Sequence, residues 1–237
     1  DPFYGFQLGF NGYFIFELAS SDLAKPDPST NSLNRYEIGL YDLTDPGNTK
    51  DLSRLEELYL KYNYSKSSIV AGRFNINTPF IGPQDGRMRP TLEEGAWISI
   101  KESEKIGFNG GWISAVSPRS TMTWFDTGNS IGVYPGGVNE DGVKSTYAGN
   151  LNSAGLALAN IYYKPVKGWK INVWDAWTEN VFNTAMIELY TERTDVKRKI
   201  DIYHGLMFIH QDALNDGGNA DPSKTYMSDG AQSNVIS

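Results

Sequence analysis

The chain has 237 residues, no Cys, 24 Gly and 13% aromatic residues, and only 21% of its residues are charged. The lack of Cys excludes a disulfide framework and any thiolate metal or redox site, and a formal net charge of −7 makes nucleic acid a poor partner. No stretch approaches the ~18 consecutive apolar residues of a membrane-spanning helix. These observations do not exclude a transmembrane β-barrel, because its strands need only about ten residues with alternate positions apolar.

The first third of the chain gives two weak strand candidates, Phe3–Leu18 and Arg35–Tyr41. The next segment, Asp51–Tyr62, has a few apolar residues at helical spacing, but its second half fits a strand better. A polar turn at Ser65–Ser68 then leads into Ile69–Phe74. Together these last segments predict a hairpin with one apolar and one polar face.

The same alternation recurs in the rest of the chain. Further strands are predicted at Ala96–Lys101, Ile106–Trp112, Ala157–Lys164, Trp169–Val173, Val181–Thr191 and Lys199–His210, with a last one beginning near Ala231. Short turns separate some of them, and long connections separate others, at Asn75–Glu94, Ser117–Ser153 and Gln211–Gly230. This alternation is typical of outer-membrane barrels, although a β-sandwich with long binding loops also fits it. The sequence therefore predicts an all-β antiparallel fold.

Several charged residues fall on the same alternating face of the predicted strands. The predicted polar face carries Glu57, Lys61, Arg73, Lys101, Lys170 and Lys199. Such a row of charged side chains, opposite an apolar face, suits the wall of a water-filled channel.

One segment carries a more specific series of residues. In chain order these are Gly72-Arg73 at a strand end, the Pro-containing run Asn77–Ile81, the run Asp85–Pro90, and Gly95 at the return into the next strand. The ordered series resembles the OprD-like family of outer-membrane porins, and the hairpin over Ile98–Trp112 is similar to that family too. The resemblance covers roughly Glu57–Val116, while the remaining chain agrees in strand rhythm only.

The resemblance implies an antiparallel transmembrane β-barrel of up to about 18 strands in the outer membrane of a Gram-negative bacterium. It implies passive diffusion of small hydrophilic solutes such as ions, amino acids and carboxylates through a charged lumen, with residues 75–94 as a loop that constricts the pore. Only about eleven strand candidates are present, so residues 1–237 are expected to form a single barrel domain that is incomplete. The expected partners are these solutes and the lipid and lipopolysaccharide of the outer membrane. The expected assembly is a monomer, a homotrimer or a member of a membrane complex.

Five residues are the candidate pore-lining or substrate residues. Arg73 lies on the predicted polar face, and Lys61 on the neighbouring strand could continue a basic row. Asp85, Arg87 and Arg89 belong to the loop whose counterpart in the family approaches the constriction, where facing charges would orient charged solutes. The alternatives are a solvated surface cation for Arg73 and a local pair or turn cap for Asp85.

No pattern in the sequence points to an enzyme. The only histidines, His204 and His210, lie on one strand without a nucleophile or phosphate-loop motif nearby. Glu93 and Glu94 are strand neighbours that point apart and so cannot act as a carboxylate pair. We therefore expect no catalytic residue, cofactor or metal. Two other functions stay open: a soluble β-sandwich that binds glycans through exposed tryptophans, and an outer-membrane barrel with a scaffold role in a larger assembly.

Overall fold

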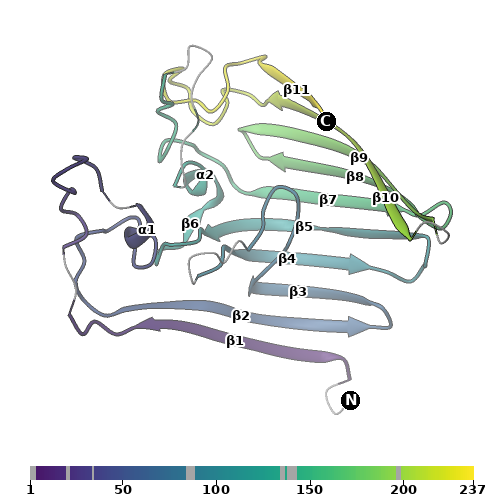
Figure 1. The fold of residues 1–237 in the computed structure, drawn as a ribbon, viewed down its shortest axis with the longest axis horizontal. Helices are drawn as coiled ribbons and strands as arrows, with labels where there is room; N and C mark the ends of the chain where they lie inside the picture. Colours follow the sequence, from purple (N-terminus) through teal and green to yellow (C-terminus); the bar gives the residue numbers. More distant parts are fainter. Residues whose placement is uncertain are drawn as a thin grey trace.

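The computed structural model describes residues 4–19, 22–33, 35–83, 89–133, 137, 143–195 and 199–237. Within these ranges the chain forms one antiparallel β-sheet of eleven strands, which curves around a hollow (Figure 1). The strands β1 and β11 lie at opposite edges, so the sheet is open. The predicted all-β antiparallel fold is confirmed. No helix in the described ranges is long and apolar enough to cross a membrane.

The strands follow one another in space in nearly the order of the sequence. They are β1 (Phe6–Ile15), β2 (Leu52–Tyr64), β3 (Ser67–Phe74), β4 (Leu92–Ile100), β5 (Ile106–Ser117), β6 (Phe125–Asp126), β7 (Leu156–Tyr163), β8 (Trp169–Thr178), β9 (Phe182–Asp195), β10 (Ile200–Ala213) and β11 (Gln232–Ile236). The short β6 pairs with Ala115 and Val116 of β5, and β7 pairs with the part of β5 up to Ile113. Pairing between consecutive strands is the arrangement that short turns favour.

The two ends of the sheet differ in their connections. Short turns join β2 to β3, β4 to β5 and β7 to β8 at one end, which we call the short-turn end. The longest connections lie at the other end, the long-loop end, together with the one-turn helices α1 (Arg35–Ile38) and α2 (Thr127–Ser130) (Figure 1). The predicted strand at Arg35–Tyr41 is wrong. Local hydrogen bonds from Leu40 N to Glu37 O and from Tyr41 N to Ile38 O close turns there instead.

The two faces of the sheet differ in polarity. One of them, the apolar face, carries exposed hydrophobic side chains along most strands, including Leu58, Leu60, Ile69, Ile106, Ile161, Val173, Leu206 and Phe208. An apolar surface this large would be costly in water at ~25 cal/mol per Å², but it suits contact with lipid chains. Tyr64, Tyr163 and Trp169 lie on this face at the short-turn end, where an interfacial aromatic belt is expected.

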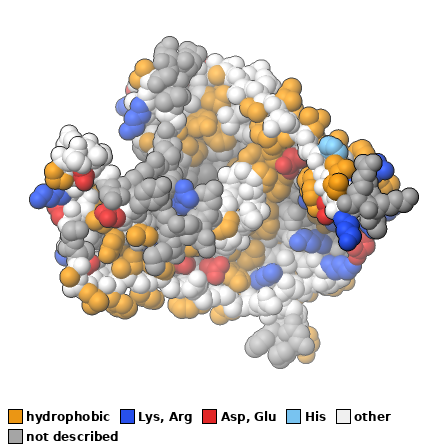
Figure 2. Space-filling model, viewed as in Figure 1, with side chains coloured by type: hydrophobic (Ala, Val, Ile, Leu, Met, Phe, Trp, Pro, Cys, Tyr) orange, Lys and Arg blue, Asp and Glu red, His pale blue; other side chains and the backbone are white. Residues whose placement is uncertain are grey.

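The opposite face, the hollow face, holds the main hydrophobic core. The chain folds back over this face after β3, and we call residues 75–83 the inward segment. Ile76, Phe80 and Ile81 of this segment pack with Phe74 and Leu158 of the sheet. The core therefore covers only part of the hollow face, and the rest stays open to solvent, as Figure 2 shows.

Candidate functional site

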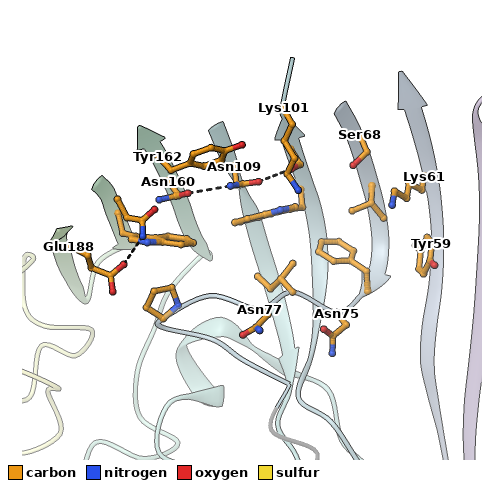
Figure 3. Close-up of a pocket in the computed structure, with 18 of the residues that line it drawn as sticks. Tyr59, Lys61, Ser68, Asn75, Asn77, Lys101, Asn109, Asn160, Tyr162 and Glu188 are labelled. Atoms are coloured by element: carbon orange, nitrogen blue, oxygen red, sulfur yellow. Dashed lines mark hydrogen bonds between the residues drawn. The ribbon is translucent and has the colours of Figure 1, made fainter. Parts of the chain in front are cut away.

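A polar cavity of about 730 Å³ lies on the hollow face between the short-turn end and the inward segment (Figure 3). Strands from β2 to β9 supply its wall, and Asn75, Asn77 and Pro79 of the inward segment lie at its other side. The alternation of each strand explains this wall, because the residues between the exposed apolar ones point into the hollow. For example, Tyr59 and Lys61 alternate with Leu58 and Leu60.

Lysines are the main charged groups of this cavity, which we call the lysine cavity. Among the described residues that line it, these are Lys61 on β2, Lys101 after β4, Lys164 after β7 and Lys170 on β8. The Nζ atoms of Lys164 and Lys170 lie 5.6 Å and 5.8 Å from the ring centre of Tyr162. Like charges around one water-filled space produce a positive potential that attracts anions. Glu57 and Glu188 also line the cavity, so its charge is mixed rather than uniformly basic.

Hydrogen-bonded side chains link neighbouring strands behind the lysines. Ser99 Oγ donates to Asn109 Oδ1 over 2.6 Å, and Asn109 Nδ2 donates to Asn160 Oδ1 over 3.2 Å. Farther along the wall, Asn172 Nδ2 donates to Glu188 Oε2 over 3.1 Å. Figure 3 shows this row of side chains crossing β4, β5 and β7. Because these polar groups satisfy one another, they form a fixed wall.

The inward segment separates this cavity from a second one. The second cavity, of about 930 Å³, lies toward the long-loop end and is lined in large part by apolar residues, including Phe80, Ile81, Ile131, Phe182 and Ile209. Asn77 and Pro79 line both cavities. The Phe80 ring meets Trp174 of β8 edge-on, with 6.3 Å between centroids. A solute that crosses the hollow would therefore pass beside this segment.

The predicted cations Lys61 and Arg73 lie on different faces of the sheet. Lys61 lines the lysine cavity. Arg73 is paired across strands with Leu58 and Glu94, on the apolar face. On the same strand, Val70 and Phe74 point the other way, into the hollow.

The surroundings of Arg73 hold it near the long-loop end of the apolar face. Its Nε donates to Glu94 Oε2 over 2.7 Å, and its guanidinium carbon lies 4.4 Å from the Trp124 ring centre. The preceding Gly72 has φ of +118°, and a Cβ there would come within 2.3 Å of Leu58 O. The part that Arg73 plays in solute passage stays a prediction, and this placement argues against it.

The remaining candidate pore residues are Asp85, Arg87 and Arg89 of the predicted loop. Asp85 and Arg87 lie outside the described residues. Arg89 is fully buried; its guanidinium contacts Met122 Sδ and lies 5.6 Å from the Tyr13 ring centre. Burial and the neighbouring Arg54 lower the pKa of Arg89, while Asp42 acts in the opposite direction. Arg89 therefore packs inside the long-loop end and does not line the lysine cavity.

Several cavity residues were not among the sequence candidates. Lys101 and Lys170 belonged to the predicted polar face, but Lys164, Asn109 and Asn160 were not singled out. The signal was present in the alternation for Asn160 and Lys170, which lie between Ala159 and Ile161 and between Trp169 and Ile171. What the sequence could not show was which of these positions meet around one space.

The fold and the cavity together define a class of protein. A sheet with one lipid-compatible face and one face that carries a lysine-lined cavity beside an inward segment is an arrangement typical of the wall of a diffusion channel. The sequence matches the OprD family of outer membrane porins over residues 17–228, and the chain belongs to this family. Membership of this family places the chain among outer-membrane proteins. The soluble β-sandwich alternative is wrong, because the family consists of membrane porins.

Solved porin structures share the fold. Pseudomonas aeruginosa OpdK, crystallised with vanillate, has a TM-score of 0.68 and 16% identity, over 98% of this chain and 51% of that one. A BenF-like porin from Pseudomonas fluorescens has a TM-score of 0.64 and 17% identity, over 91% and 48%. Pseudomonas aeruginosa OccD3 has a TM-score of 0.57 and 18% identity, over 70% and 37%. The chain thus spans about half or less of each porin. No curated protein matches the sequence.

Proposed function

We propose that these strands belong to one closed barrel domain of up to about 18 strands that spans the outer membrane. Open edges at β1 and β11 would leave rows of unpaired backbone groups, which lipid does not tolerate. The apolar face would then meet lipid and lipopolysaccharide, and the hollow face would become the lumen.

The function that this arrangement supports best is passive diffusion of small hydrophilic solutes, with a preference for anions such as carboxylates. The observation that carries it is the set of lysines Lys61, Lys101, Lys164 and Lys170 around one polar cavity. Weakly held charges attract a solute and also release it, which conduction requires. The vanillate in the OpdK structure is itself a carboxylate, which agrees with this preference. Amino acids fit as well, since Glu57 and Glu188 would face their ammonium groups.

We also propose that residues 75–91, the part of the predicted loop 75–94 that precedes β4, form the constricting loop of the pore. Support comes from the inward segment, which packs on β7 and β8 and separates the two cavities. Asp85 and Arg87 stay predicted charges of this loop, and the buried Arg89 would anchor it.

The test is ion selectivity of the full chain in planar lipid bilayers. Replacing Lys61, Lys101, Lys164 and Lys170 together by Gln should shift the reversal potential in a KCl gradient toward cation preference. Lys199→Gln is the matched control, because Lys199 is exposed at the turn before β10, outside the cavity. Unchanged selectivity in the fourfold variant would contradict the proposal. Intact β-structure that forms no channels would favour the scaffold alternative.

A further inference from the structure

Two buried ionisable side chains of the wall contact the two ends of the connection between β3 and β4. Glu93 on β4 contacts the beginning, at Ile76, and Arg54 on β2 contacts the end, at Pro90. Both side chains are almost completely buried, with Glu93 at 0% and Arg54 at 3% exposure. Neither residue was a candidate at the sequence level.

Glu93 lies in apolar surroundings on the hollow face. Its partners across the strands are Phe74 on β3 and Val116 on β5, and both are buried. Its Oε2 accepts a hydrogen bond from Ile76 N over 3.1 Å, while its Oε1 is buried and has no hydrogen-bond partner among the residues that the structure describes. A carboxyl group in such a place is costly to bury. An apolar residue would suit the sheet better, so the Ile76 contact is what this group adds to the fold.

Arg54 connects the end of the same loop to two other parts of the wall. Its Nη2 donates to Pro90 O over 3.0 Å and to Glu56 Oε1 over 2.6 Å. Its Nη1 donates to Ser117 Oγ over 3.1 Å and to Thr121 O over 3.0 Å. The guanidinium therefore holds the loop end, β5 and the connection after β5 in one arrangement.

The inward segment is itself closed by short-range hydrogen bonds. Thr78 N donates to Ile81 O over 2.8 Å, and Ile81 N donates to Thr78 Oγ1 over 2.8 Å. Thr91 N donates to Pro83 O over 2.8 Å, which joins the two limbs of the loop. A segment closed in this way keeps its own shape, so the contacts at the two ends of the connection, together with its packing on Phe74 and Leu158, hold it in place.

We propose that Glu93 and Arg54 are positioning residues that clamp the two ends of the connection between β3 and β4, and so set how far the inward segment extends between the two cavities. This inference rests on the proposed function, in which the segment narrows a pore. The clamp acts through the segment, and neither side chain lines the lysine cavity. Removing the Glu93 contact should free the segment without weakening the sheet.

The chain has no Cys, so a single Cys in place of Leu158, a β7 residue that is 1% exposed beneath the inward segment, reports the position of the segment. In full chains reconstituted in lipid, the labelling rate of this thiol is compared in Glu93→Gln and Glu93→Leu variants. Glu93→Gln keeps an acceptor for Ile76 N and should label at the parent rate. Glu93→Leu should label about fivefold faster, the factor that corresponds to the ~1 kcal/mol of one hydrogen bond. Its resistance to thermal unfolding should equal or exceed that of the parent.

Glu94→Gln is the matched control, because Glu94 is the next residue and points to the opposite face. Equal labelling of the Gln and Leu variants would overturn the clamp, and so would faster labelling that accompanies a lower unfolding temperature. Should Glu93→Leu not assemble, Glu93→Ser, too short to reach Ile76, must label faster than the parent. Conductance of the same variants tests the proposed function separately: faster labelling at unchanged conductance supports the clamp and contradicts the constriction.

Discussion

The lysines of the cavity and the buried arginines of the long-loop end carry the same charge in opposite surroundings. Lys61 and Lys170 face an open, water-accessible cavity, whereas Arg54 and Arg89 are at most 3% exposed. Arg54 donates four hydrogen bonds to protein groups. Its guanidinium is therefore not free to bind a solute. A solvated ammonium can attract a passing anion and release it. A desolvated guanidinium that donates to several segments, as that of Arg54 does, instead holds those segments together.

The largest effect is expected from Arg54→Met. This change leaves Glu56 buried without its cation and removes the donor for Pro90 O. We expect a loss of ~3–5 kcal/mol in the free energy of unfolding, measured by tryptophan fluorescence during urea unfolding in detergent. The double variant Arg54→Met with Glu56→Leu should recover much of that loss, because it also removes the unpaired buried charge. A parent-like midpoint for Arg54→Met would show that the cluster is not structural.

A smaller loss of stability is expected in the cavity wall. Asn160→Leu removes the acceptor of Asn109 Nδ2 and should lower the free energy of unfolding by ~1–2 kcal/mol. The matched control is Asn152→Leu in the connection before β7, where the side chain is exposed. Equal effects of the two substitutions in urea unfolding would mean that the side-chain row across β4, β5 and β7 does not stabilise the wall.

Charge reversal at Lys61 and at Arg73 compares the two faces of the sheet directly. Lys61→Glu should lower the permeability ratio of anion to cation on the order of twofold, because Lys61 lines the cavity. Arg73→Glu should leave that ratio unchanged, since Arg73 pairs with Glu94 on the apolar face. Both are read from reversal potentials in bilayers. A shift with Arg73→Glu alone would support its sequence-predicted place in the pore and refute the assignment of faces.

The sequence could predict the strands and, for most of them, the face that each residue takes. On β5, β7 and β8 the positions of Asn109, Asn160 and Asn172 are polar between apolar neighbours, so alternation alone separates the faces. On β3 the pattern is reversed, because Val70 and Phe74 point into the hollow. The inward segment covers that part of the wall with Ile76 and Phe80 and makes it apolar. A single strand pattern contains no information about a segment that packs on it from elsewhere.

Glu93 shows the same limit for a functional residue. The sequence indicates that Glu93 and Glu94 point apart, and the structure agrees, since Glu94 pairs with Arg73 while Glu93 is buried. Which of the two would be buried depends on Phe74, Val116 and the returning chain at Ile76. The burial of an ionisable side chain is a property of the assembled fold, so tertiary contacts and not periodicity decide it.

The smallest effect is expected at the short-turn end, from the ion pair of Lys66 and Glu104. The two side chains are 60% and 86% exposed, so solvent screens their attraction. The hydrogen bond with Lys66 lowers the pKa of Glu104, and the same bond raises the pKa of Lys66. The contribution of Glu104 is thus present above the ordinary pKa of a glutamate and fades as the pH falls through its lowered value. That of Lys66 fades only as the pH rises through its raised value.

Lys66→Gln should therefore leave the unfolding midpoint unchanged at neutral pH, where both charges of the parent pair are present. It should also leave the loss of stability at low pH unchanged, because the screened pair contributes little stability that protonation could remove. The measurement is urea unfolding of the parent and the variant between about pH 3 and pH 7. A clear difference at pH 7 that vanishes toward pH 3 would show that an exposed pair stabilises this turn. In that case exposure alone would not separate structural cations from the solvated lysines of the cavity.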